Sequence, residues 1–336
     1  MEALATKYRP NSYEEVSSQD SIIKILKQQT TQRTFVGCYL LCGPSGCGKT
    51  TIARIFGKEI NQGKGTIIEI DGASNNGVDN VRAIIEDAYE RSLDSEYKVY
   101  VVDEVHMITT QGWNAFLKCI EEPPKYTIFI FCTTDPQKIP ATILNRVMRF
   151  NLSKVKTDDI EKRLEYICQQ EGFTNYKESC DYISKISNGG MRDAIALLDK
   201  CSAFEKDLSI QNVLSALGSF SYDTYFDLTE SLLNKDDRNV LGIIEYIYNS
   251  GNDLKLFIEQ YLSFLLDLSK FSIFNTFKMI KIPEVYSQRV VNVTGFNDSK
   301  KYYTNLVDSV LEIKNQIRYD SNAKDTVEIM LLQQCK

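Results

Sequence analysis

The chain has 336 residues, of which 43% are hydrophobic and 25% are charged, and its formal net charge is −6 at pH 7. These values are typical of a globular protein of two or three domains, and they argue against a surface that is basic throughout. No run of about 18 apolar residues is present and the first residues form no apolar signal core, so we expect a cytoplasmic protein without a membrane span.

The first 150 or so residues alternate between strand and helix patterns. After a polar segment, the spacing of apolar residues predicts helices at 21–29, 51–56, 78–91 and 113–120, and strands at 38–42, 66–70, 97–104 and 126–133. This alternation implies right-handed crossovers and a mostly parallel sheet. Ligands of such sheets bind at the carboxyl ends of the strands.

A phosphate-binding loop (P-loop) follows the first strand. Residues 43–50 fit the pattern G-x-x-x-x-G-K-[ST], and the strand before and the helix after them argue against an ordinary glycine-rich turn. Its backbone N–H groups would face phosphate oxygens, Lys49 would reach the β- and γ-phosphates, and the Thr50 hydroxyl would hold Mg²⁺. The residues expected to bind nucleotide here are Gly43, Pro44, Ser45, Gly46, Cys47, Gly48, Lys49, Thr50 and Thr51.

The third strand ends in two acids, Asp103 and Glu104, which is the Walker B pattern. Asp103 would orient Mg²⁺ and Glu104 would activate the attacking water. A strand that ends in solvated acids is the alternative, and the P-loop about fifty residues upstream argues against it. His106 suggests a DEAH-type helicase, but no other helicase motif is evident, so we interpret it as a local structural residue.

Three further polar residues are candidates only in context. Thr134 ends the fourth strand and can sense the γ-phosphate, although a strand-end cap is the better interpretation of it alone. Arg146 and Arg192, the latter at a helix start, would each be interpreted in isolation as a surface charge.

The nine cysteines form no C-x-x-C pairs, which is typical of free thiols in a reducing compartment. Cys38, Cys42 and Cys47 are close in sequence, but no fourth ligand is near, so buried thiols are a better interpretation than a metal site. With His106 as the single histidine, histidine metal sites and Ser/His or Cys/His triads are almost excluded.

From about residue 153 the strand signal disappears. Helices are expected at 158–170, 177–187 and 191–203, and residues 206–336 have helical patterns throughout, with many Tyr, Phe and Leu residues. Some of these side chains could face a partner, but core packing is the better explanation for most of them.

Together these motifs resemble the bacterial clamp-loader ATPase subunits (the gamma/tau subunits of the DNA polymerase III loader), within the AAA+ superfamily. The resemblance is strong over residues 4–203 and weak beyond, and residues 73–78 are more specific than any P-loop. The residues that carry it are Lys7-Tyr8-Arg9-Pro10, the P-loop, Glu69 to Val78, Val102 to Met107, Leu117 to Pro124, Thr133-Thr134 and Met191-Arg192-Asp193-Ala194.

The resemblance implies roles for matching positions. Thr134 would be sensor 1, Arg192 would be sensor 2, which reaches the γ-phosphate from the lid, and Arg146 would be an arginine finger that reaches a neighbouring subunit's ATP. The residues implied for the adenine pocket are Tyr8, Arg9, Pro10 and Val16. Because a trans arginine is typically worth about 10³–10⁵ in turnover, hydrolysis would depend on assembly.

The chain departs from the family pattern in two places. The family's Ser-Arg-Cys is Asn145-Arg146-Val147 here, which keeps the arginine. The zinc module usual before the second strand is missing, since residues 57–65 contain no cysteine, so no zinc is expected. The chain also ends soon after its last helical region, so we expect a minimal version of viral or divergent bacterial origin, located in the host cytoplasm if viral.

The resemblance implies an α/β P-loop AAA+ ATPase domain at 1–152, a helical lid at 153–205 and an all-α collar at 206–336 that holds a pentamer, either mixed or mostly copies of this chain. ATP would order a spiral of subunits that opens a sliding clamp and encloses primer-template DNA, and hydrolysis would release both. DNA phosphates are expected at two helix starts, where polar caps are also common. The candidate residues are Asn76, Arg82, Thr110 and Gln111.

Two other functions stay open. A non-hydrolysing structural subunit of the same assembly is one, and the filled catalytic positions argue against it. A different AAA+ DNA-remodelling machine, such as a branch-migration motor or an initiator loader, is the other. It would be expected to carry a winged-helix domain at its C-terminus, and no hairpin followed by a basic helix is evident after residue 206.

Overall fold

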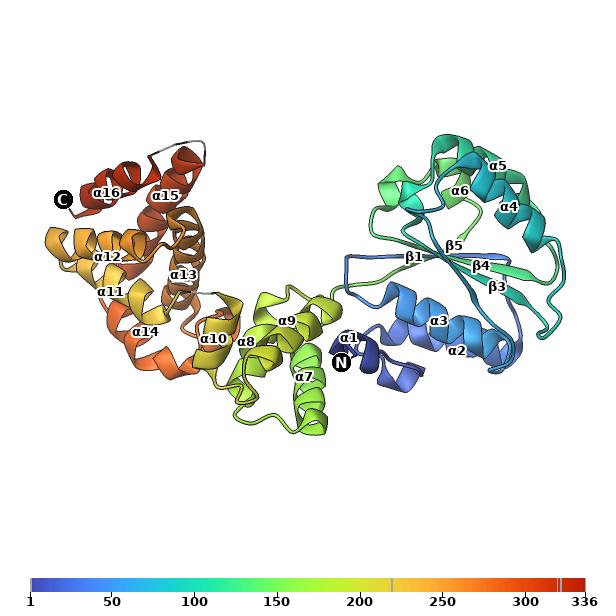
Figure 1. The fold of residues 1–336 in the computed structure, drawn as a ribbon, viewed down its shortest axis with the longest axis horizontal. Coiled ribbons are helices and arrows are strands. Elements are labelled where there is room, and N and C mark those ends of the chain that lie inside the picture. Colours follow the sequence, from blue (N-terminus) through green and yellow to red (C-terminus); the bar gives the residue numbers. More distant parts are fainter. Residues whose placement is uncertain (1, 219, 319, 321, 336) are drawn as a thin grey trace. The chain divides into compact units, whose positions relative to one another are not determined.

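Strands β1 to β5 form one sheet in the order β2-β3-β4-β1-β5, and all neighbouring pairs are parallel (Figure 1). The computed structural model describes residues 2–218, 220–318, 320 and 322–335. The expected parallel sheet is confirmed, and a fifth strand that the sequence pattern did not predict lies at its edge. The strands are Cys38–Cys42 (β1), Ile68–Asp71 (β2), Lys98–Asp103 (β3), Thr127–Thr133 (β4) and Met148–Asn151 (β5).

The chain divides into two compact units. We call Met1–Ile167 with Ser187–Ala196 the sheet unit, and Cys168–Ile186 with Leu197–Lys336 the helical unit. Two helices, Thr157–Glu171 (α7) and Met191–Phe204 (α9), begin in the sheet unit and end in the helical unit. Each unit is described by itself below.

Helices cover both faces of the sheet (Figure 1). Successive residues of β1 alternate between two cores, as the period of a strand requires: Tyr39 and Leu41 pack with α2 and α3, whereas Leu40 packs with α4 and α5. Because both faces of the sheet are covered, every residue of β1 and β4 is buried, and most of these residues are apolar. The helices of this unit are Leu4–Lys7 (α1), Asp20–Gln32 (α2), Lys49–Ile60 (α3), Val78–Ala88 (α4), Thr110–Glu121 (α5) and Ala141–Leu144 (α6).

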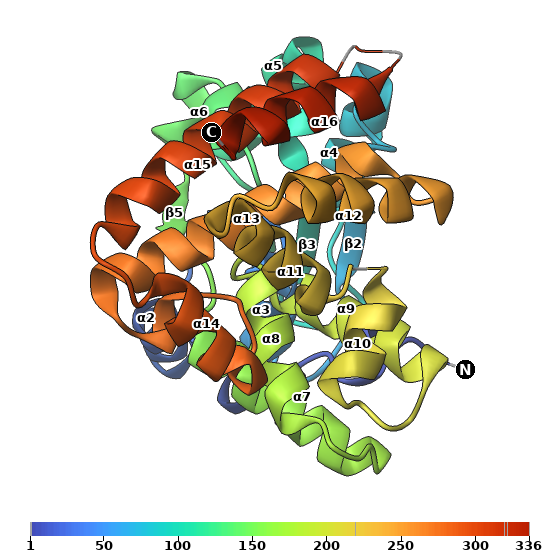
Figure 2. The same ribbon diagram turned by 90° about the vertical axis from the view of Figure 1, so that its left-hand side faces the viewer.

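The helical unit has an aromatic core centred on its longest helix, Leu254–Phe274 (α13). Phe257, Tyr261 and Phe264 of α13 are buried and pack against Tyr225 of α11. Near the C-terminus, α15 and α16 lie side by side (Figure 2). The other helices are Lys177–Ile186 (α8), Ile210–Leu217 (α10), Tyr222–Leu233 (α11), Asp237–Asn249 (α12), Ser287–Thr294 (α14), Ser299–Ile317 (α15) and Ala323–Gln334 (α16).

None of the helices in the described part of the chain is long and apolar enough to cross a membrane. The expected helices at 158–170, 177–187 and 191–203 correspond to α7, α8 and α9. The residues described beyond 206 are mainly α-helical, as the patterns predicted, and they also contain short 3-10 turns and one isolated bridge at Asp207, which the patterns did not predict.

Candidate functional site

The P-loop lies between β1 and α3, at the carboxyl edge of the sheet. Gly46 and Gly48 have φ angles of +70° and +101°, which favour glycine because a Cβ atom strains this region. Lys49 is the first residue of α3, and its Nζ donates to the carbonyl oxygens of Gly43 and Pro44, at 2.9 Å each. With only 7% of Lys49 exposed, a buried ammonium stands inside a loop of backbone amides, which fits a bound phosphate chain.

Two side chains whose oxygen atoms can bind a metal ion lie in contact beside the P-loop. The Thr50 hydroxyl donates to Asp103 Oδ2 at 2.5 Å, although the residues are 53 positions apart, and the Glu104 backbone N–H donates to Asp103 Oδ1 at 2.9 Å. A hydroxyl and a carboxylate are the ligands that Mg²⁺ prefers, so these residues fit a nucleotide-bound Mg²⁺ ion.

Glu104 leaves the line of β3 through a left-handed backbone conformation, with φ +46°. Its carboxylate Oε2 accepts a hydrogen bond from the Thr134 hydroxyl at 3.2 Å, and His106 Nδ1 lies 3.2 Å from the same oxygen. A glutamate with a left-handed backbone conformation is uncommon and strained, and strained residues of this kind are frequent at functional sites. The structure therefore brings the two expected catalytic residues, Glu104 and Thr134, into contact.

The start of α9 is attached to the P-loop. The Met191 N–H donates to the Gly46 carbonyl at 3.0 Å, and a Cβ atom on Gly46 would lie 2.9 Å from Gly190 Cα. This contact places Arg192 in the neighbourhood of the P-loop, and its role in sensing the γ-phosphate stays a prediction.

Arg9 stands in a cluster of charges near the same loop. Burial lowers the pKa of Arg9 most, and the cations Arg54 and Arg192 lower this pKa further, whereas Glu69 and Asp103 oppose them. Arg54 is ion-paired with Glu69. The surplus of guanidinium groups around the P-loop suits a multiply charged anion such as a nucleoside triphosphate.

A pocket of about 760 Å³ lies between the N-terminal segment and α7. Tyr8, Arg9 and Val16 line it, and Pro10 belongs to the same segment. The opposite wall contains Asp159, Lys162, Arg163 and Tyr166, which the sequence analysis missed because no motif marks them. Arg163 donates to the Tyr8 carbonyl at 2.8 Å and fixes this wall in place. The volume is in the range of small-molecule sites.

Arg146 is held away from the P-loop cluster. Its Nη2 lies 2.8 Å from Glu121 Oε1, and its Nη1 donates to the Thr142 carbonyl at 2.6 Å. Among the described residues, no hydrogen bond or ion pair joins Arg146 to the P-loop. The side chain is exposed at the surface, where another molecule can reach it.

The two helix starts expected at DNA lie beside each other. The Asn76 carbonyl accepts hydrogen bonds from both the backbone N–H and the hydroxyl of Thr109, at 3.1 Å each, which joins the start of α4 to that of α5. Thr110 and Gln111 are the exposed first residues of α5. Arg82 is exposed one turn into α4 and ion-paired with Asp79.

All nine cysteines are free and buried, in agreement with the interpretation as apolar thiols. The described residues contain no group of three or more His, Cys, Asp or Glu side chains that could hold a metal ion. Helix α3 ends at Ile60 and β2 begins at Ile68, so the connection between them is short.

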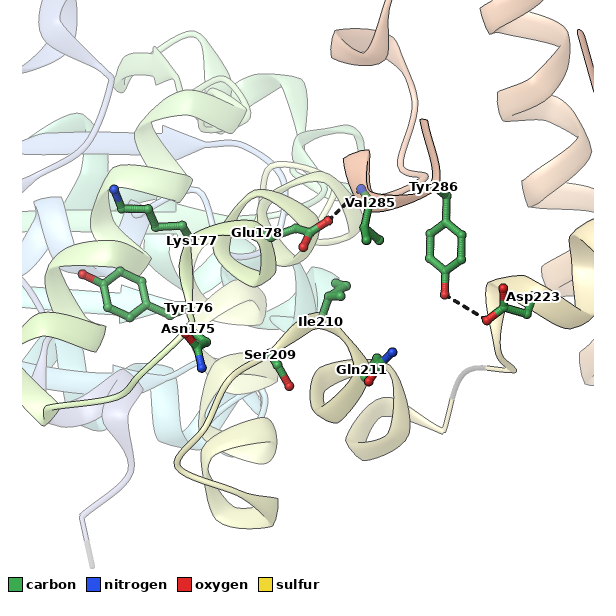
Figure 3. Close-up of a pocket in the computed structure, with 10 residues that line it drawn as sticks. All are labelled: Asn175, Tyr176, Lys177, Glu178, Ser209, Ile210, Gln211, Asp223, Val285 and Tyr286. Atoms are coloured by element: carbon green, nitrogen blue, oxygen red, sulfur yellow. Dashed lines mark hydrogen bonds between the residues drawn. The ribbon is translucent and has the colours of Figure 1, made fainter. Parts of the chain in front are cut away.

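A second pocket, of about 740 Å³, lies in the helical unit (Figure 3). Glu178 of α8 accepts a hydrogen bond from the Val285 backbone N–H at 3.1 Å, and the Tyr286 hydroxyl donates to Asp223 at 3.4 Å (Figure 3). No catalytic motif contributes to its lining, so the candidate site is the P-loop edge of the sheet unit.

Family models match successive parts of the chain. A model described as DNA polymerase III, delta subunit, matches residues 61–156, and one for the Rad17 P-loop domain matches 1–102. The DNA polymerase III clamp loader subunit, ATPase lid domain, matches 159–205, and domain III of the DNA polymerase III subunits gamma and tau matches 208–334.

Among solved structures, the RuvB Holliday junction branch migration motor of Thermotoga maritima is similar, with a TM-score of 0.54 and 19% identity over 67% of this chain and 79% of that chain. This likeness shows the fold alone, which is that of P-loop AAA+ ATPases.

Several relatives match over most of this chain. DNA polymerase III subunit tau of Bacillus subtilis is 35% identical over 80% of this chain and 51% of its own length, and the gamma/tau subunit of Mycoplasma genitalium is 30% identical over 92% and 55%. The chain thus spans about half the length of these two relatives. The gamma subunit of Buchnera aphidicola (subsp. Schizaphis graminum) is 30% identical over 98% of this chain and 97% of its own length. The protein therefore belongs to the gamma/tau family of DNA polymerase III clamp-loader subunits, which are P-loop AAA+ ATPases.

Proposed function

We propose that this protein hydrolyses ATP to drive the loading of a sliding clamp onto primer-template DNA. The observation that carries the proposal is the constellation at the carboxyl edge of the sheet. Lys49 stands inside the P-loop, Thr50 contacts Asp103, and Thr134 contacts Glu104. Each residue type matches one requirement of phosphoryl transfer: a cation, a Mg²⁺ site and an orienting carboxylate.

The chain's own residues divide the work between them. The P-loop amides and Lys49 bind the phosphates, while Thr50 and Asp103 hold Mg²⁺, which neutralises charge on the phosphates when it is bound. Glu104 accepts a proton from the attacking water, or orients it, and Thr134 fixes the Glu104 carboxylate. The adenine occupies the pocket lined by Tyr8, Arg9 and Val16, with Pro10 beside them, and Arg192 contacts the γ-phosphate.

Arg146 acts on the nucleotide of a neighbouring subunit. In the single chain Glu121 pairs with its guanidinium, so assembly would exchange one carboxylate for a phosphate. An arginine supplied in this way stabilises the charge of the transition state. Hydrolysis then waits for the complete assembly, a pentamer held by a collar at residues 206–336.

The DNA partner is held through its phosphates. The joined starts of α4 and α5 present Asn76, Thr110 and Gln111 together, and Arg82 adds a cation one turn along. Contacts of this kind carry no base specificity, which suits a loader that acts at any primer end. Because bound phosphates release counterions, DNA affinity should fall as the salt concentration rises.

The test is ATP hydrolysis by the chain assembled with its partner subunits, with and without primer-template DNA and the cognate clamp. DNA and clamp together should stimulate turnover strongly. Arg146→Ala should reduce the stimulated rate about 10³-fold or more, while ATP binding is retained. Arg238→Ala, which removes an exposed arginine of α12, is the matched control. Turnover that ignores both DNA and clamp in a complete assembly would contradict the proposal.

A further inference from the structure

The only histidine of the chain lies against the proposed general base. His106 belongs to the 3-10 turn Val105–Met107, directly after Glu104, and 12% of its side chain is exposed. Its Nδ1 lies 3.2 Å from Glu104 Oε2 and 3.2 Å from the hydroxyl of Thr133. The sequence analysis interpreted His106 as a local structural residue, whereas this geometry indicates a role at the Glu104 carboxylate.

The 3.2 Å between His106 Nδ1 and Glu104 Oε2 is an ion-pair distance, and the hydrogen-bond partner of Nδ1 is the Thr133 hydroxyl. An ionised carboxylate can only accept a hydrogen bond, so this short distance is favourable when His106 Nδ1 carries a hydrogen. Thr134 donates to the same oxygen, Oε2. The Thr134 hydroxyl and the His106 ring nitrogen, from different segments, thus both lie 3.2 Å from one carboxylate oxygen, and the other, Oε1, has no hydrogen-bond partner among the described residues. This asymmetry leaves Oε1 as the oxygen that can meet a water molecule.

The surroundings hold the imidazole in place. Thr133 is fully buried, and its hydroxyl oxygen accepts the Asp135 N–H at 3.0 Å, so the second oxygen near Nδ1 is fixed. On the other side, the Met107 N–H donates to the Glu104 carbonyl at 2.9 Å and closes the turn that carries both side chains. Buried Val105 anchors this turn in the core of the sheet unit.

We propose that His106 is a positioning residue for ATP hydrolysis: with Thr134 it holds Glu104 Oε2, so that Oε1 faces the attacking water. The proposal rests on the ATP hydrolysis proposed above and assigns His106 no contact with the nucleotide. It predicts a loss of turnover without a loss of ATP affinity. A purely structural histidine would change stability instead.

The kinetic test compares His106→Ala and His106→Asn with Met107→Ala, an exposed neighbour in the same turn. In the assembled complex, His106→Ala should lower kcat about 10-fold, because one hydrogen bond to a charged group is lost, while KM stays within about twofold. His106→Asn should recover most of the rate, because its amide N–H can replace Nδ1–H. Met107→Ala should behave as the unchanged chain.

The second readout needs no turnover. Because the chain has one histidine, ¹⁵N-histidine labelling of the full chain gives a single imidazole to follow by nuclear magnetic resonance. Nδ1 should carry the hydrogen, and Glu104→Gln should shift its resonance, whereas Glu86→Gln, an exposed change on α4, should not.

Three results would overturn the inference: a bare Nδ1 in the unchanged chain, a wild-type kcat in His106→Ala, or equal impairment of the Ala and Asn variants. If the unchanged complex hydrolyses no ATP at all, the proposed function fails. The resonance experiment then still decides whether His106 donates to Glu104.

Discussion

The two units of this protein use their polar side chains in opposite ways. In the sheet unit, polar residues that are far apart in the sequence meet at the strand ends: Thr50 contacts Asp103, and Glu104 contacts Thr134. In the helical unit, polar side chains join a helix to another helix or to a connecting segment. Arg289 of α14 pairs with three carboxylates of α11, and buried Asp267 of α13 accepts the Lys281 N–H.

The difference shows that the site residues of the sheet unit depend on short sequence motifs, whereas the contacts of the helical unit depend on how its helices pack. A parallel sheet delivers its strand ends to one edge, so short motifs suffice to build a site there. Helix packing has no such edge, so each ion pair depends on where a particular helix crosses another. We therefore expect substitutions in the sheet unit to affect turnover first, and those in the helical unit to affect unfolding first.

The substitution Glu104→Gln tests this difference with the largest expected effect. Loss of the general base should lower kcat about 10²–10⁴-fold, while ATP still binds, because the P-loop is untouched. Steady-state hydrolysis together with binding of a fluorescent ATP analogue measures both effects. The isosteric change Glu86→Gln on α4 should alter neither, and a Glu104→Gln chain with full turnover would break the comparison.

Gly46→Ala tests the contact between the P-loop and α9. The left-handed conformation costs about 1–2 kcal/mol once a Cβ is present, and this Cβ would also lie 2.9 Å from Gly190 Cα. We expect about a tenfold or greater loss of ATP affinity. Gly63→Ala is the matched control, since Gly63 is also left-handed, with φ +76°, but meets no atom within 4 Å. Equal losses of ATP affinity in the two variants would show that the contact with Gly190 does not affect ATP binding.

Arg289→Met tests the helical unit. The side chain is only 27% exposed and lies within 3.0 Å of Asp223, Asp227 and Glu230, so its loss leaves three carboxylates facing one another. The free energy of unfolding should fall by about 1–3 kcal/mol, with ATP turnover per folded assembly unchanged. Lys314→Met, which removes a more exposed pair with Glu259, should cost less than about 1 kcal/mol in the same chemical denaturation series.

The smallest expected effect concerns the pH dependence of unfolding. Burial raises the pKa of Asp267 above its ordinary value of 3.8, although the Lys281 N–H and Lys270 oppose this. The folded chain therefore holds this proton more tightly than the unfolded chain, and that stabilising contribution is lost as the pH rises from 3.8 through the folded pKa.

The Asp267→Asn variant has no such proton. The unfolding free energy of the unchanged chain, relative to that of the variant, should thus decline over this pH range, as calorimetry at several pH values would show. A difference that rises with pH would contradict the assignment.

The sheet and the P-loop could be predicted because their determinants are local: alternating apolar strands, the glycines at 46 and 48, and acids at a strand end. Strand β5 could not, because it has four residues and only Phe150 among them is buried. The pocket wall at Arg163 could not be predicted either, since it depends on a contact with Tyr8, which is 155 residues away in the sequence. His106 was visible in the sequence, but only the left-handed backbone of Glu104 turns the two side chains together.

Helix α9 belongs to both units of the protein without a break. Its first residue, Met191, donates a hydrogen bond to Gly46 of the P-loop, and its last residues belong to the helical unit. A helix of 14 residues is about 21 Å long, so a tilt of about 10° at its start displaces its end by about 4 Å. Because no loop interrupts the helix, a tilt at Met191 would also move Phe204.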